Sequence, residues 1–353
     1  MCNSLVRLIE TQKPILRGAE KMSLMKAYYA CKPLMPRSFR TGLRRVRAVY
    51  KQWACSDYWP IDPRSVAPPD GFPGWPGGKR FAVVLTHDVE GKRGLDQVES
   101  LMALESVRGF RSSFNFVPEG EYRVPDSLRL TLEHAGFEVG IHGLKHDGKL
   151  YSSHAEFSRR AARIQEYRRK WRVAGFRSPF MHHDLEWIHE LGMEYDASTF
   201  DTDPFEPQPD GAGTIFPFWV PNSRGGGYVE LPYTLVQDYN LFIVLRQRTN
   251  EIWKRKLDWL AEHGGMVLIN THPDYMSFGG KRGPDQYAAD HYAEWLSYIS
   301  QNYRGTFWHA LPRDMARFYR STLTGLEPIA TQATDSMRRS VSAGTQYLND
   351  NAL

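Results

Sequence analysis

The chain has 353 residues, of which 41% are hydrophobic and 24% are charged. This composition is typical of a globular protein with a sizeable core, large enough for one large α/β domain or two smaller ones. No apolar run approaches the ~18 residues that a membrane-spanning helix needs, and three cysteines near the N-terminus argue against a disulfide framework.

The net charge of +5 is unevenly distributed along the chain. Residues 1–60 hold 12 Lys and Arg against 3 Asp and Glu, a net charge of +9, so the remainder carries a net charge of −4. We expect residues 1–58 to form a basic, helical N-terminal arm. Such a helix can pack on the main domain with its basic face in solvent, or it can lie on an anionic membrane surface. The rest of the chain has no basic stripe with interleaved aromatic residues, so we expect no nucleic-acid partner.

Residues 59–78 are dense in Pro and Gly, which predicts a connector with little regular structure. Over residues 79–321, strand-like and helix-like segments alternate. This alternation predicts an α/β domain with a mostly parallel sheet, and a barrel-like arrangement at this length. Residues 200–227 interrupt the alternation as a long loop with a short strand at 215–220, and residues 322–353 are expected to be a peripheral tail. The expected strands are 81–86, 111–117, 137–142, 173–177, 195–199, 228–233, 265–271 and 306–308. The expected helices are 94–108, 125–135, 153–171, 184–191, 251–263, 285–301 and 312–320.

Charged side chains follow five of the predicted strands at the point where each strand ends. They are Asp88 with Glu90, His142 with His146, Arg177, Asp201 with Asp203, and His272 with Asp274. Because the carboxyl ends of parallel strands meet at the same edge of a sheet or barrel, we expect these side chains to form an active site.

Two histidines four residues apart, joined by a carboxylate from another strand end, suit a divalent cation such as Zn²⁺. Glycines surround His142 and His146, which predicts a loop at a strand end and not a helical metal motif. A bound metal would polarise a carbonyl group and lower the pKa of its water. A carboxylate that the metal does not use could deprotonate that water, and an imidazole opposite it could protonate a leaving amine. Arg177 could keep the base carboxylate ionised through a charge-assisted bond.

These motifs, in this order, resemble those of the polysaccharide deacetylases of the NodB-homology carbohydrate esterase family, over about residues 79–320. The resemblance implies a distorted (β/α)7 barrel. It also implies that Asp88, in Leu85-Thr86-His87-Asp88, is the catalytic base and that His142 and His146 are the metal pair.

The later motifs of the family match as well. Arg177-Ser178-Pro179-Phe180 resembles its Arg-x-Pro-aromatic motif, and Asp203 matches the acidic residue of the fourth motif. Leu268-Ile269-Asn270-Thr271-His272 resembles the last motif, which implies that His272 is the catalytic acid. We expect Pro179, Phe180 and, at the last strand end, Trp308 to contact the substrate.

The first motif departs from the family pattern at one position. The family commonly has two adjacent aspartates, the base and then a metal ligand, but Val89 stands in the second place here. Glu90 then becomes the metal carboxylate and Asp88 the base. Two alternatives are that Asp88 binds the metal, which leaves the base unassigned, and that the site has lost its metal.

The sequence therefore predicts a metal-dependent hydrolase that removes an N-acyl group, with acetyl as the first candidate, from an amino sugar of a polysaccharide or lipid-linked glycan precursor. Other amide cleavages, such as deformylation, fit the same resemblance. The alternative from another class is a non-catalytic carbohydrate-binding or scaffold protein on the same barrel. Because no signal peptide is visible, we expect a cytoplasmic protein, with the basic arm in peripheral contact with the inner face of the membrane.

Overall fold

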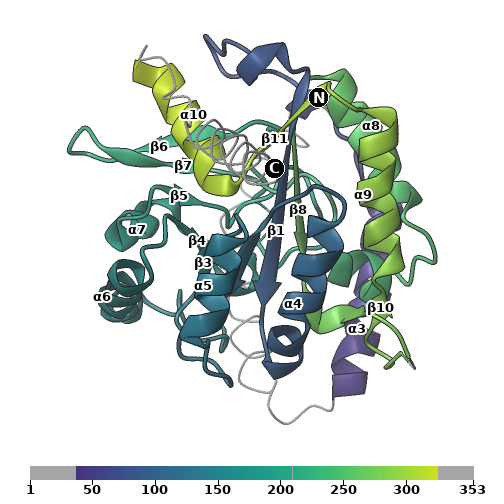
Figure 1. Cartoon of the computed structure of the whole chain (residues 1–353), viewed down its shortest axis with the longest axis horizontal. Coiled ribbons are helices and arrows are strands. Elements are labelled where there is room, and N and C mark those ends of the chain that lie inside the picture. The colour runs from purple at the N-terminus through teal and green to yellow at the C-terminus, as the bar shows by residue number, and fades with distance from the viewer. Residues whose placement is uncertain (1–36, 209, 281, 325–353) are drawn as a thin grey trace, which may run out of the picture.

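Strand β1 (Phe81–Val89) lies at the centre of a curled, mostly parallel sheet (Figure 1). The computed structural model of this protein describes residues 37–208, 210–280 and 282–324. One edge of β1 pairs with β8 (Met266–Thr271). The other edge pairs first with β11 (Phe307–His309) and then with β2 (Ser113–Phe116). Every residue of β1 is buried, as expected for a strand that is covered on both faces.

The sheet continues from β2 and curls until its far side meets β8. The parallel strands that follow β2 are β3 (Glu138–His142), β4 (Gly175–Arg177), β5 (Tyr195–Asp196) and β7 (Gly227–Glu230). Beyond β7, the backbone N–H groups of Thr234 and Leu235 both donate to the carbonyl oxygen of Leu268 on β8. Seven strands therefore follow one another around the curl, and the predicted distorted (β/α)7 barrel is confirmed.

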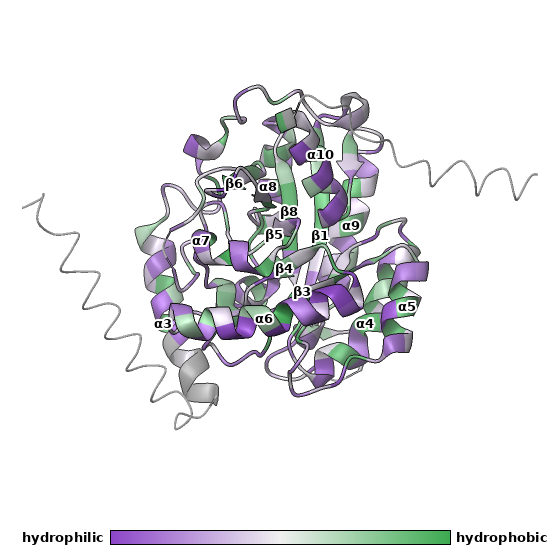
Figure 2. Ribbon diagram, turned by 90° about the vertical axis from the view of Figure 1, so that its left-hand side faces the viewer, coloured by the Kyte–Doolittle hydropathy of each residue, from purple (hydrophilic) through white to green (hydrophobic). Residues whose placement is uncertain are grey.

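Helices alternate with these strands and cover the outside of the curled sheet (Figure 1). Their bounds are α4 (Lys92–Ser106), α5 (Asp126–His134), α6 (His154–Trp171), α7 (Leu185–Ile188), α8 (Glu251–Glu262), α9 (Asp290–Asn302) and α10 (Pro312–Thr324). Helix α8 shows why they pack there: Trp253, Leu257 and Leu260 recur at helical spacing and are buried. Figure 2 shows the apolar strands β1 and β8 between helices that carry polar residues on their outer sides.

The N-terminal part of the described chain is helix α3 (Arg37–Ala54), which is followed by a connector with two short 3₁₀ turns, Pro63–Ser65 and Pro76–Gly78. The rest of the predicted arm, residues 1–36, and residues 325–353 of the predicted tail lie outside the described residues. Among the helices that the structure describes, none is long and apolar enough to cross a membrane.

The region between β5 and β8 differs most from the expectation. The expected strand at 215–220 is present as β6 (Phe218–Pro221), which pairs antiparallel with β7. The segment Tyr239–Val244, for which no helix was predicted, forms a π-helix directly after Asp238. A small two-stranded sheet, β9 (Met276–Ser277) with β10 (Tyr287–Ala288), follows β8.

Candidate metal centre and active site

The carboxylate of Asp88 is fixed by an amide from each neighbouring strand. Its Oδ1 accepts a hydrogen bond from Asn115 Nδ2 at 2.9 Å, and its Oδ2 accepts one from Asn270 Nδ2 at 2.8 Å. Asn115 lies directly opposite Asp88 in the β1–β2 register, and Asn270 stands near the end of β8. Both oxygens of this buried carboxylate are therefore held in place by neutral donors, which leave its charge intact.

Arg177, at the end of β4, lies close to the same carboxylate. Its Nη1 lies 3.7 Å from Asp88 Oδ1 and donates a hydrogen bond to Thr86 Oγ1 at 2.7 Å, while its Nε donates to the carbonyl oxygen of Ala197 at 2.8 Å. The guanidinium is fully buried. Arg177 thus meets Asp88 as an ion pair without a direct hydrogen bond, and its orientation is set by Thr86 and Ala197.

The charges around Asp88 favour its ionised form. Burial alone would raise the pKa of Asp88, but the positive charges nearby, which include those of Arg177 and His272, outweigh burial and lower this pKa. A buried carboxylate that is ionised at neutral pH is suited to accept a proton.

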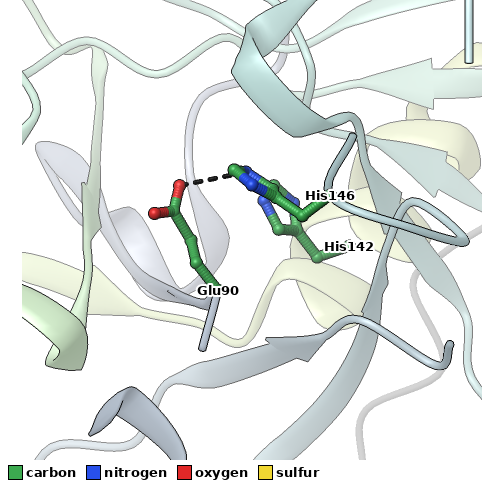
Figure 3. A group of neighbouring side chains, drawn as sticks. All are labelled: Glu90, His142 and His146. Carbon is green, nitrogen blue, oxygen red and sulfur yellow. Dashed lines mark ion pairs between the residues drawn. The ribbon is translucent and has the colours of Figure 1, made fainter. Parts of the chain in front are cut away.

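Glu90, His142 and His146 point toward one another at the carboxyl edge of the sheet (Figure 3). Their ligand atoms all lie within 4.8 Å of one another. Glu90 Oε1 lies 3.1 Å from His146 Nε2. Glu90 comes from the residue after β1, His142 from the end of β3, and His146 from the loop that follows β3. The structure therefore brings together the three residues that the sequence predicts as metal ligands.

The hydrogen bonds of the two imidazoles test whether a metal fits this cluster. His142 Nδ1 donates to the carbonyl oxygen of Arg177 at 3.1 Å, so Nε2 carries no proton, and this buried Nε2 has no hydrogen-bond partner. The buried Nε2 of His146 also makes no hydrogen bond and lies 3.1 Å from Glu90 Oε1 as an ion pair. Burial lowers the pKa of His142 to about 4, so its ring is neutral. Two imidazole nitrogens that make no hydrogen bond, one of them 3.1 Å from a carboxylate oxygen, are the donor set of a divalent cation such as Zn²⁺.

The loop that carries Glu90 is held from the opposite side by Asp274. The Asp274 carboxylate accepts hydrogen bonds from the backbone N–H groups of Glu90 and Gly91, both at 2.9 Å, and of Gly94 at 3.1 Å. A Cβ atom on Gly94 would collide with this carboxylate. Tyr275 Oη donates to Glu90 Oε2 at 2.7 Å, which leaves Oε1 to face the histidines. Asp274 and Tyr275 therefore orient the metal carboxylate.

His272 stands directly after β8 and is bound by Asp238. Its Nδ1 donates to Asp238 Oδ1 at 2.6 Å, and its backbone N–H donates to Asp238 Oδ2 at 2.8 Å. Its Nε2 lies 4.0 Å from Asp88 Oδ2 and 3.9 Å from Glu90 Oε1, which is too far for a hydrogen bond to either. Burial alone would lower the pKa of His272, but these carboxylates raise it to about 10. The ring therefore carries both protons at neutral pH and can donate the one on Nε2.

The sequence matches Asp203 to the acidic residue of the fourth motif, but the acid that binds His272 in the structure is Asp238. Asp203 accepts a hydrogen bond from Tyr233 Oη at 3.1 Å and lies beside Glu206. Burial and Glu206 raise the pKa of Asp203 to about 7, so it is a poor anionic partner for an imidazolium. Asp238 has this role. Its only signal in the sequence is an acid a few residues beyond a predicted strand.

Of the expected substrate contacts, Pro179 and Phe180 lie beside the metal ligands. The ring of Phe180 is 4.3 Å from that of His146, and Phe180 adopts a positive φ of 62°. Pro179 is buried against Gly143, where an added Cβ would lie 2.5 Å from the proline ring. Phe180 is only partly buried, so it can form part of the wall that a substrate meets.

Trp308 lies elsewhere, and its assignment to the substrate site is wrong. It pairs with Ala82, six residues before Asp88 on β1, which separates it from the site by about 20 Å. Its ring packs against Trp75 at 6.2 Å and Phe318 at 5.1 Å. Trp308 is half-buried and packs against the core at the opposite end of the barrel.

The solved structures that are similar to this chain include three deacetylases. A putative polysaccharide deacetylase from Mycobacterium smegmatis is 19% identical and matches with a TM-score of 0.54 over 73% of this chain and 96% of that one. A putative polysaccharide deacetylase involved in O-antigen biosynthesis from Bordetella bronchiseptica is 17% identical, over 70% and 89% of the two chains, with a TM-score of 0.39. The peptidoglycan deacetylase PdaC from Bacillus subtilis is 14% identical, over 75% and 98%, with a TM-score of 0.40.

The first of these similarities establishes that the chain has the fold of that deacetylase, and the other two are too weak to carry an argument. No protein-family model and no curated protein matches the sequence.

Proposed function

We propose that this chain, which has the polysaccharide-deacetylase fold, is a metal-dependent hydrolase that removes an N-acyl group from an amino sugar. Acetyl is the first candidate for the acyl group. The observation that carries the proposal is the convergence of three metal-type ligands, Glu90, His142 and His146, with a separate ionised acid, Asp88, and a protonated imidazole, His272. A surface cluster of charges would not keep these three roles distinct.

The contacts of Asp88 and Glu90 support one of the two possible assignments of base and metal ligand. Both oxygens of Asp88 are engaged by side-chain amides, whereas Oε1 of Glu90 faces the two histidines. We therefore assign Glu90, His142 and His146 as the residues that hold the cation and Asp88 as the base. Zn²⁺ is the first candidate for the metal because two imidazoles and one carboxylate are common ligands of catalytic zinc.

A divalent cation bound there supplies Lewis-acid polarisation of the acyl carbonyl and lowers the pKa of water. The protein residues handle the protons. Asp88 accepts a proton from the attacking water, and Arg177 beside it favours the ionised form of that carboxylate. The bond from the acyl carbon to nitrogen breaks as His272 Nε2 gives its proton to the amine. The products are a carboxylic acid and a free amino sugar, and Asp238 stabilises the imidazolium before this transfer.

The substrate that we propose is an N-acylated glycan, either a polysaccharide or a lipid-linked precursor. We place the protein in the cytoplasm, at the inner face of the membrane, where a peripheral contact of residues 1–58 with anionic lipid would bring it to a lipid-linked sugar. The rival proposal is a non-catalytic carbohydrate-binding protein on the same barrel.

The test combines metal analysis with a search for acyl release. Purified wild-type protein is expected to hold close to one equivalent of Zn²⁺ or another transition metal, and the His142→Ala/His146→Ala variant is expected to hold almost none. The control variant is His263→Ala, which removes an exposed histidine at the end of α8 that is not among the proposed ligands. This variant should keep the metal. Release of acetate from N-acetylated oligosaccharides should follow the metal content. A wild-type protein that binds glycans but takes up no Zn²⁺, Co²⁺ or Ni²⁺ would favour the carbohydrate-binding protein.

A further inference from the structure

Helix α3 packs on the barrel through polar side chains. Arg45 donates from Nε and Nη2 to the carbonyl oxygen of Ile243, at 3.2 and 3.1 Å. Lys51 Nζ donates to the carbonyl oxygen of Pro204. Ala48 lies between them and is buried. The face of α3 toward the protein is therefore made largely of long basic side chains that bind backbone carbonyl groups.

The opposite face of α3 presents large apolar side chains to solvent. Val46, Val49, Tyr50 and Trp53 have exposed fractions of 71%, 65%, 66% and 76%. Their spacing of i, i+3, i+4 and i+7 places them in one row, which we call the α3 stripe. These four are the majority of the seven large hydrophobic side chains that are exposed in the described part of the chain. An ordinary surface helix turns its apolar side chains toward the core, whereas α3 turns this row toward solvent. Such an exposed apolar row indicates a binding surface.

The charge of α3 indicates what covers the α3 stripe. The helix contains six Arg and Lys and no Asp or Glu, and Arg47 is exposed beside the stripe. Apolar residues that include Trp and Tyr, flanked by basic side chains, suit the interface of an anionic lipid layer. A second copy of the chain would instead bring together two helices whose charged residues are all basic, and like-charge repulsion opposes this contact. We propose that the α3 stripe binds the surface of an anionic membrane.

The position of α3 relates this surface to the active site. Helix α3 lies at the end of the molecule toward which the arrowhead of β1 points, the end that carries the site (Figure 1). Arg44 Nη1 donates to Tyr239 Oη at 3.0 Å, and the ring of Tyr239 lies 4.9 Å from that of Tyr275, which binds Glu90. A chain docked by the α3 stripe would hold its metal centre near the lipid surface. Docking would therefore give the site access to a lipid-linked sugar. That access rests on the proposed function, whereas the docking itself does not.

The experiment is co-sedimentation of the full chain with vesicles. One set contains phosphatidylglycerol in phosphatidylcholine, and the other contains phosphatidylcholine alone. The variant Val49→Ser/Trp53→Ser removes half of the α3 stripe. The matched control, Val107→Ser/Leu130→Ser, removes two apolar side chains that are 80% and 51% exposed on another part of the surface. We expect wild type and control to bind the anionic vesicles, more weakly at high salt, and the stripe variant to bind at least tenfold more weakly. Hydrolysis of a soluble N-acetylated oligosaccharide should be the same in all three proteins.

Four results would overturn the inference. They are a wild type that binds no vesicles, equal binding to anionic and neutral vesicles, a stripe variant that binds like wild type, and a solution dimer that the stripe variant dissociates. The last result would assign the α3 stripe to a second copy of the chain. Vesicle binding needs no substrate, so loss of docking with intact hydrolysis refutes this inference alone. Docking without hydrolysis of any glycan would count against the proposed function instead.

Discussion

Asp238 binds His272 through both of its carboxylate oxygens. Oδ1 accepts the imidazole proton on Nδ1 at 2.6 Å, and Oδ2 accepts the backbone N–H of the same residue at 2.8 Å. Tyr287 Oη also donates to Oδ2, at 3.0 Å. The ring is therefore fixed in one orientation, with Nε2 directed toward Asp88 and Glu90. A proton donor held in this way does not have to find its position after the substrate binds.

The variant Asp238→Asn should lower kcat by about 100-fold, the range expected when acid catalysis is impaired. The carboxylates around His272 raise its pKa to about 10, and the reaction needs the protonated ring. Removal of the Asp238 charge lowers that pKa, so the alkaline limb of the kcat–pH profile should move to lower pH. Asp203→Asn is the control and should leave the alkaline limb in place. An unchanged alkaline limb in Asp238→Asn would show that His272 is not the acid.

The variant Gly94→Ala should disturb the metal loop. The new methyl group would collide with the Asp274 carboxylate, which must then release the N–H groups of Glu90 and Gly91. Overpacking of this kind costs about 1–3 kcal/mol of unfolding free energy. We expect a lower Tm, measured by thermal denaturation, together with a lower affinity for Zn²⁺. Wild-type values of both quantities would contradict the role of Asp274 in placing Glu90.

Phe180 and Trp308 allow the corrected substrate site to be tested. Phe180→Ala should raise KM for an N-acetylated oligosaccharide by about tenfold, because an aromatic contact of about 1.4 kcal/mol is lost. Trp308→Phe should lower Tm, since Trp308 packs against the core with Trp75 and Phe318, and should leave KM unchanged. Steady-state kinetics at one pH distinguish the two. A raised KM in Trp308→Phe alone would restore the original assignment.

The strand ends were predictable because their signals are local. Short apolar runs that end in Asp88, His142, Arg177 and His272 mark buried parallel strands, and such strands bring their carboxyl ends to one edge. The metal ligands could also be predicted, since His142 and His146 are close in sequence and Glu90 directly follows a strand.

The two errors have different physical causes. Asp203 lies four residues beyond a predicted strand, but burial beside Glu206 favours its neutral form, and burial cannot be read from spacing. Asp238 precedes a π-helix whose apolar residues carry no helical period. The expectation for Trp308 assumed that all strands end together. β11 instead pairs with the first residues of β1, and strand register depends on long-range packing.

We claim that Glu90 holds the metal while Asp88 acts as the base. The most direct measurement compares metal content and acetate release in two isosteric variants, Asp88→Asn and Glu90→Gln. The amide contacts of Asp88 predict that Asp88→Asn keeps close to one equivalent of Zn²⁺ and loses hydrolysis. Glu90→Gln is expected to lose the metal and the activity together. Loss of the metal in Asp88→Asn, with retention in Glu90→Gln, would contradict the claim and exchange the two roles.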